Sequence, residues 1–239
     1  MFFYLVHRRF PTPLGTLLLP FAVFPLMAMM VWFIAFLHWG RDDLFLALNP
    51  LRSDVLDFVM VLATQLGHGV TFVVLTVGAL WIRLRWCLML ATGFLVSGLG
   101  VQWGKRMWWS DLDRPRSYFE GLEIPIQWVD GIRPHGMHTF PSGHTATAFA
   151  MLALLALMST RPRNRMLLGI VACGVAYSRV YLAQHFAVDV VVGALWGLVA
   201  ALLAAWIFYL PWDNVPALEG RLNRRLQWRR PDQHQTIDS

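Results

Sequence analysis

Charged residues are scarce in this chain, and their scarcity excludes an ordinary soluble domain. Only 14% of the 239 residues are charged, whereas soluble domains contain about a quarter. Long stretches carry no charge at all, first between Arg9 and Arg41 and then from Phe58 to Ile82. Stretches of this length and apolarity are typical of membrane spans. The composition therefore predicts a polytopic membrane protein, and the length predicts a single domain.

Cysteine and clustered carboxylates are also rare. The two cysteines, Cys87 and Cys173, lie in apolar segments, which excludes a disulfide framework. We find no carboxylate-rich cluster suited to Mg²⁺, so we expect neither a metal nor another cofactor. The net charge of +6 is explained by basic cytoplasmic loops, so we expect no nucleic-acid partner.

The uncharged stretches predict an all-α fold with six transmembrane helices. The first stretch is too long for a cleaved signal peptide and is interpreted as a retained span. The six expected spans are residues 13–39, 70–84, 86–104, 143–160, 166–181 and 186–212. Between the first two we expect a peripheral amphipathic helix, Ser53–Leu66, with Ser53 or Asp54 as N-cap. Two small-residue pairs, Gly100/Gly104 and Gly193/Gly197, are candidates for close helix packing.

Basic residues gather in alternate loops and predict the orientation of the chain. Arginines occur near the N-terminus, at 83 and 85, at 161–165 and in the tail after residue 220. With six spans these segments share one side, which the positive-inside rule makes cytoplasmic. We therefore expect both termini in the cytoplasm. Residues 1–212 form the predicted membrane domain, and residues 213–239 form a basic cytoplasmic tail.

Three polar clusters lie at span ends on the opposite, non-cytoplasmic side. They are Lys105-Arg106 with Arg114-Pro115, then Pro141 to His144, then Ser178 to Asp189. Arginine binds phosphate oxygens in a bidentate manner, and a helix that begins at Pro-Ser-Gly offers free N–H groups to an anion. His144 and His185 supply a general acid and a nucleophile, and Asp189, four residues after His185, can orient its ring.

These clusters resemble the three signature motifs of the type-2 phosphatidic acid phosphatase (PAP2) superfamily. The family pattern is Lys-x6-Arg-Pro, then Pro-Ser-Gly-His, then Ser-Arg-x5-His-x3-Asp. The second motif matches fully at Pro141 to His144, and the third matches at Ser178, Arg179, His185 and Asp189. The resemblance covers residues 105–189, and within the superfamily the bacterial phosphatidylglycerophosphatase B group is the most similar type.

The first motif departs from the family pattern. Eight residues separate Lys105 from Arg114, and seven separate Arg106 from Arg114, where the pattern has six. Both Lys105 and Arg106 therefore remain candidates for the leading cation, and the residue type favours Lys105.

The resemblance implies a role for each matching residue. His185 attacks phosphorus and forms a phosphohistidine, Asp189 orients His185, and His144 protonates the leaving oxygen and then activates water. The phosphate oxygens are bound by Lys105 or Arg106, Arg114, Ser142, the Gly143 amide and Arg179. No metal is implied.

The function expected from this resemblance is hydrolysis of a lipid phosphate at the membrane. The candidate substrates are phosphatidylglycerol phosphate, phosphatidate, undecaprenyl pyrophosphate and lipid A, and nothing in the sequence ranks them. Two alternatives stay open: a phosphotransferase that uses undecaprenyl pyrophosphate as donor, and a non-catalytic lipid-binding membrane protein. The expected partners are the lipid substrate and the bilayer, and the oligomeric state is left open.

Overall fold

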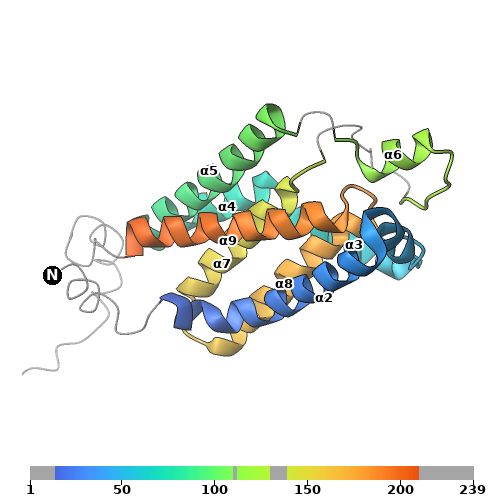
Figure 1. Ribbon diagram of the computed structural model, residues 1–239. Coiled ribbons are helices and arrows are strands. Elements are labelled where there is room, and N and C mark those ends of the chain that lie inside the picture. Colours follow the sequence, from blue (N-terminus) through green and yellow to red (C-terminus); the bar gives the residue numbers. More distant parts are fainter. Residues whose placement is uncertain (1–13, 110–111, 130–138, 210–239) are drawn as a thin grey trace, which may run out of the picture.

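All regular elements that the structure describes are helices. The computed structural model describes residues 14–109, 112–129 and 139–209 (Figure 1). Its helices are α2 (Leu14–Leu48), α3 (Asp54–Leu66), α4 (Gly69–Ala79), α5 (Leu84–Met107), α6 (Pro115–Gly121), α7 (Gly143–Met158), α8 (Pro162–Tyr181) and α9 (Ala187–Tyr209). The prediction of an all-α fold is confirmed for this part of the chain.

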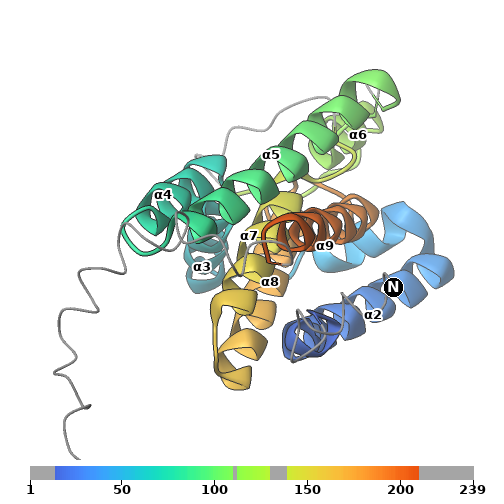
Figure 2. The same cartoon turned by 90° about the vertical axis from the view of Figure 1, so that its left-hand side faces the viewer.

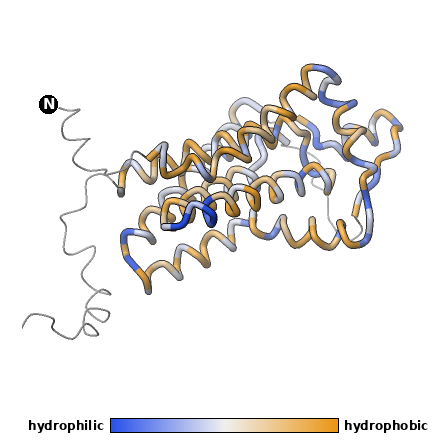
Figure 3. Tube along the Cα trace, turned by 90° about the horizontal axis from the view of Figure 1, so that it is seen from below, coloured by the Kyte–Doolittle hydropathy of each residue, from blue (hydrophilic) through white to orange (hydrophobic). Residues whose placement is uncertain are grey.

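Hydrophobic residues run along most of the length of the long helices (Figure 3), and many of them are exposed. Leu37 on α2, Leu99 on α5 and Trp206 on α9 are 68%, 66% and 59% exposed. An apolar surface of this extent marks contact with a membrane or a partner. Helices α2, α5 and α9 are long and apolar enough to cross a bilayer, so the chain is a multi-pass membrane protein.

Six crossings, in contrast, are not confirmed. Each expected span coincides with a helix, but α7 has only 16 residues, and α8 carries arginines near both ends. Length and composition support three crossings among the described residues, or four if the bent pair α3 and α4 counts as one.

Several predicted boundaries were wrong. The second span was expected to reach Leu84, but α4 ends at Ala79 and a turn leads directly into α5. Helix α2 continues past Trp39 to Leu48 through a kink at Gly40, whose φ of 77° is a left-handed conformation that glycine adopts readily. The expected cap of α3 is confirmed: the Ser53 side chain accepts a hydrogen bond from the Leu56 N–H at 3.3 Å.

Helix α7 lies at the centre of the bundle, with α5, α8 and α9 packed around it (Figure 2). Its residues from Thr145 to Leu154 are all buried. A helix that is apolar on every side is stable only where protein or lipid surrounds it. Because the neighbouring helices surround it, α7 is held mainly by protein contacts.

Close packing between α7 and α9 depends on the predicted glycine pair Gly193/Gly197. A Cβ atom at Gly193 would lie 2.5 Å from the Ser142 carbonyl oxygen, and one at Gly197 would lie 2.4 Å from the Ala146 carbonyl oxygen. Both distances are far below van der Waals contact, so only glycine fits at this separation of the two helices. The other predicted pair, Gly100/Gly104, packs against tryptophan rings.

We expect Gly193→Ala to lower the free energy of unfolding by about 1–3 kcal/mol, because the added methyl group must push the two backbones apart. Gly174→Ala is the matched control: it also lies within a helix, but nothing lies within 4 Å of its added Cβ. Unfolding of both variants in detergent measures the difference. Equal stability of the two variants would show that the α7 and α9 backbones can move apart at little cost in free energy.

Candidate active site

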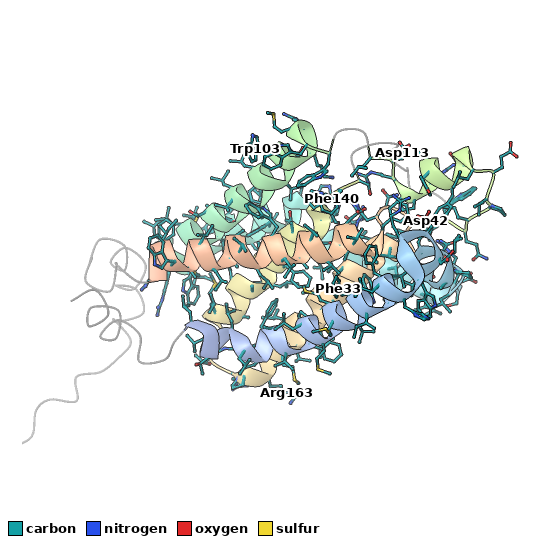
Figure 4. All side chains as sticks on the ribbon, viewed as in Figure 1. Phe33, Asp42, Trp103, Asp113, Phe140 and Arg163 are labelled. Carbon is teal, nitrogen blue, oxygen red and sulfur yellow. The ribbon has the colours of Figure 1, made fainter. Side chains whose placement is uncertain are left out.

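The three polar clusters meet at one end of the bundle. The residues come from the last turn of α5, the start of α6, the start of α7, the end of α8 and the start of α9. The Ser142 N–H donates to the Asp189 carbonyl at 2.9 Å and so joins the second motif to the third. In Figure 4 the labelled residues Phe140, Asp113 and Asp42 lie on the side of the molecule that holds the site, and Arg163 lies on the opposite side.

The segment that carries His185 is held by the end of α8. The backbone N–H groups of Gln184 and His185 both donate to the Arg179 carbonyl, at 3.0 and 3.1 Å. Ala183 has a φ of 53°, and this left-handed residue turns the chain sharply between α8 and α9. The turn places the His185 side chain in the interior, where it is 1% exposed.

Asp189 lies beside His185, as the spacing of the third motif predicted. The His185 Nδ1 is 3.4 Å from Asp189 Oδ2. The same carboxylate oxygen accepts a hydrogen bond from the Phe186 N–H at 3.0 Å and a short one from the Thr139 hydroxyl. Thr139 Oγ1 in turn lies 3.3 Å from His185 Nδ1. The ring is therefore held at Nδ1, which leaves Nε2 for chemistry.

Burial lowers the pKa of His185 well below its ordinary value, and the positive charges of Arg179, Arg114 and Lys105 act in the same direction. A hydrogen bond to the Thr139 backbone opposes this shift. Because the lowered pKa lies below neutral pH, the imidazole is neutral there. A neutral imidazole has a free lone pair, which is the form that can act as a nucleophile.

Three buried or half-buried cations surround the His185 ring. Lys105 is 8% exposed and Arg179 is 6% exposed, and Lys105 interacts electrostatically with Arg114, Arg179 and Asp189. Arg106, on the contrary, is exposed. The structure thus brings Lys105 to the site and turns Arg106 away from it.

The guanidinium groups are held in place by neutral side chains. Arg114 donates to the Gln184 Oε1 at 3.0 Å, and Arg179 donates through Nη1 to the Thr64 hydroxyl at 2.6 Å. The Arg179 Nε is buried and has no hydrogen-bond partner in the described part of the chain. A buried donor of this kind is costly to leave unpaired, so it is suited to bind an anion.

The start of α7 completes the site. Ser142 is fully buried, and its hydroxyl accepts from the Thr145 hydroxyl at 2.9 Å. Gly143 begins the helix, whose free N–H groups and dipole favour an anion at this end. His144 follows, half-buried, and it interacts electrostatically with Arg179, Arg114 and His185.

Four neighbours of the site were missed as site residues by sequence reasoning: Thr64, His68, Thr139 and Gln184. The Nδ1 of His68 caps α4 by accepting from the Val70 N–H at 3.3 Å. Its ring also packs 5.8 Å from that of His144. Gln184 could have been suspected from its place inside the third motif. Thr64 gave no signal, because only the tertiary fold brings α3 to α8. His135 and His138, which precede the second motif in the sequence, lie outside the described residues.

Comparison with known proteins agrees with this geometry. A model of the PAP2 superfamily matches residues 84–213. The crystal structure of Aquifex aeolicus LpxE has a similar fold, with a TM-score of 0.61 and 24% identity over 70% of this chain and 94% of that chain. The crystal structure of the first transmembrane PAP2 type phosphatidylglycerolphosphate phosphatase from Bacillus subtilis matches with a TM-score of 0.45 and 22% identity, over 79% and 94% of the two chains. No curated protein matches the chain.

We expect Lys105→Met to weaken the binding of inorganic phosphate about ten- to hundredfold, because it removes a charged donor from a buried site. Methionine keeps the length of the apolar stem. Arg106→Met is the matched control and should bind as the unaltered protein does. The phosphate concentration needed to raise the melting temperature in detergent measures both. A larger loss for Arg106→Met would reverse the assignment of the leading cation.

Proposed function

Because the chain belongs to the PAP2 superfamily as a PAP2-type membrane lipid phosphatase, we propose that it hydrolyses a lipid phosphomonoester or diphosphate through a phosphohistidine at His185. The observation that carries the proposal is a buried imidazole held at Nδ1 beside Asp189 and facing three cations. Phosphatidylglycerol phosphate, phosphatidate, undecaprenyl pyrophosphate and lipid A are all candidate substrates.

In the first step the His185 Nε2 attacks phosphorus and the bond to the leaving oxygen breaks. The step requires His144 to be protonated when the negative lipid phosphate is bound beside it, and His144 then gives that proton to the leaving oxygen, so that the lipid alcohol or lipid phosphate leaves in a stable form. Lys105, Arg114 and Arg179, together with Ser142 and the Gly143 amide, bind the phosphoryl oxygens as charge spreads over them. Stabilisation of this kind is usually the largest catalytic contribution.

In the second step water resolves the phosphohistidine. His144, now neutral, takes a proton from the attacking water, the bond between Nε2 and phosphorus breaks, and inorganic phosphate leaves. His185 returns to its neutral form with the proton at Nδ1. The cations supply the charge neutralisation that a metal gives in other phosphatases, so the reaction requires no metal.

We further propose six crossings, with both termini in the cytoplasm of a bacterial inner membrane and the site on the opposite face. Two observations support it. Helix α7 is surrounded by protein, so it can lie at membrane depth despite its 16 residues. The arginines at 161–165 lie at the end of α8 that is opposite Arg179, as the positive-inside rule requires. The division into a membrane domain and a tail after residue 212 stays a prediction, because residues 210–239 lie outside the described part.

We expect purified protein in detergent to release phosphate from at least one of the four candidate lipids with EDTA present. His185→Ala should lower the rate roughly 10³-fold or more, because the nucleophile is lost. His38→Ala is the matched control, an exposed histidine on α2, and should keep full activity. Labelled substrate should trap a phosphoenzyme in the unaltered protein and in His38→Ala, and none in His185→Ala.

Three results would contradict the proposal. Activity lost to EDTA would contradict the metal-free mechanism. Full activity of His185→Ala would remove the assigned nucleophile. Transfer of phosphate to an added lipid alcohol in preference to water would make the protein a phosphotransferase.

The orientation can be tested with single cysteines in a Cys87→Ala/Cys173→Ala background. Leu122→Cys, in the loop after α6, and Arg163→Cys, at the start of α8, are both exposed positions. We expect a membrane-impermeant maleimide to label Leu122→Cys in intact spheroplasts and Arg163→Cys only after the membrane is opened. The reverse labelling pattern would place the site on the cytoplasmic side.

A further inference from the structure

Thr139 lies outside the three motifs but contacts both members of the His185–Asp189 pair. Its hydroxyl oxygen is 3.3 Å from His185 Nδ1 and forms a short hydrogen bond with Asp189 Oδ2. The three side chains are 3%, 1% and 2% exposed, so little water competes for these contacts. The hydroxyl therefore lies between the carboxylate and the imidazole.

The direction of these hydrogen bonds follows from the chemistry of the groups. An ionised carboxylate only accepts, so the single hydroxyl proton of Thr139 points at Asp189 Oδ2. The hydroxyl then faces His185 Nδ1 with a lone pair. Asp189 Oδ2, 3.4 Å from the same nitrogen, also faces it with a lone pair. Nδ1 meets two acceptors, and it must carry the proton.

Each of the two contacts at Nδ1 is long for an N–H···O hydrogen bond, whose usual range is about 2.7–3.2 Å. The Nδ1 proton is therefore shared between Thr139 and Asp189. Asp189 Oδ2 already accepts from the Phe186 N–H at 3.0 Å and from Thr139. Without the hydroxyl, Asp189 Oδ2, at the longer distance, would be the one side-chain acceptor left at Nδ1 among the described residues.

The backbone fixes the position of this hydroxyl. The Thr139 N–H donates to the Leu112 carbonyl at 3.1 Å, in the segment just before Arg114. The neighbouring Phe140 ring packs at 4.7 Å from the Trp109 ring. A β-branched side chain has few rotamers, so an anchored backbone also fixes the direction of Oγ1.

We propose that Thr139 is a positioning residue that holds the proton of His185 on Nδ1, so that Nε2 is kept unprotonated for attack on phosphorus. The proposal rests on the phosphohistidine function proposed above. The Thr139 hydroxyl donates its proton to Asp189 and accepts the Nδ1 proton of His185. Its hydrogen bond to the negative carboxylate makes the hydroxyl oxygen a stronger acceptor for the ring. When Nε2 gains the phosphoryl group the ring becomes positive, and the same two acceptors stabilise the Nδ1 proton.

The tautomer can be measured without any substrate. Protein labelled with [¹⁵N]histidine in detergent gives ring-nitrogen shifts that separate protonated from unprotonated nitrogens, and the spectrum of His185→Asn identifies the His185 signals. We expect the Nδ1–H tautomer in the unaltered protein and in Thr139→Ser. In Thr139→Val, which keeps the shape but lacks the hydroxyl, the Nε2–H tautomer should become populated. An Nε2–H tautomer in the unaltered protein, or identical spectra for Thr139→Val and the unaltered protein, overturns the proposal.

Turnover gives a second, independent readout. Thr139→Val should lower kcat about ten- to hundredfold through the lost hydrogen bond to a charged pair, with KM changed less than about threefold because substrate contacts remain. Thr139→Ser should restore kcat to within about threefold. Thr76→Val is the control, since its hydroxyl donates only to the Phe72 carbonyl of its own helix, at 2.8 Å.

A double-mutant cycle separates positioning from folding. If Thr139 acts through Asp189, then Thr139→Val adds little to the loss already caused by Asp189→Asn. Additive losses, or equal impairment by Thr139→Val and Thr139→Ser, mean that Thr139 serves only to pack the core, and the proposal fails. Should Thr139→Val not fold, Thr139→Ala removes the hydroxyl without adding bulk and takes its place.

The two proposals fail in different ways. If the unaltered protein releases no phosphate from any lipid, the proposed function is wrong, and the histidine spectra still decide the role of Thr139. If the protein is active and the spectra show Nε2–H, the function stands and the role of Thr139 is wrong.

Discussion

The hydrogen bond from the Ser142 N–H to the Asp189 carbonyl is the contact on which the arrangement of the site depends. It ties the first turn of α7 to the first turn of α9. It forms only because Gly193, one turn further along α9, lets the two backbones touch. His144 and His185, for which we propose action on opposite sides of one phosphorus atom, are thereby placed by backbone packing. Side-chain flexibility has little part in their separation.

The candidate site brings three cations close together. Lys105, Arg114 and Arg179 all act on His185, and the Asp189 carboxylate beside them is engaged with Thr139 and the Phe186 N–H. Like charges brought together in a poorly solvated place repel one another and cost stability. Under the proposed function a bound phosphate group relieves that repulsion, and this relief contributes to its affinity.

The sequence predicted that the site residues would meet at one end of the bundle, because the motifs lie at the ends of predicted helices. Ser142, His144, His185 and Asp189 stand at fixed spacings at helix ends, and those helices formed where the apolar stretches predicted. The choice between Lys105 and Arg106 needed the structure. Helical residues one apart point about 100° apart, so a single position decides whether a side chain is buried or exposed.

Contacts between segments that are distant along the chain could not be predicted from the sequence. Thr64 reaches Arg179 from a helix 115 positions earlier, and a threonine in an apolar helix gives no sign of such a partner. The six crossings predicted from the sequence are not confirmed by helix length and composition, and the reason is physical. Hydropathy measures transfer to lipid, and α7 is stabilised by its protein neighbours, so its short length says little about its depth.

The central position of α7 has a consequence for the order of biosynthesis. The ribosome delivers α7 before α8 and α9, which later cover two of its sides. Asp189, which we propose orients His185, is in the first turn of α9. A nascent chain therefore carries Lys105, Arg114 and His144 well before it carries Arg179, His185 and Asp189. Under the proposed function it stays inert until most of its membrane domain has been made.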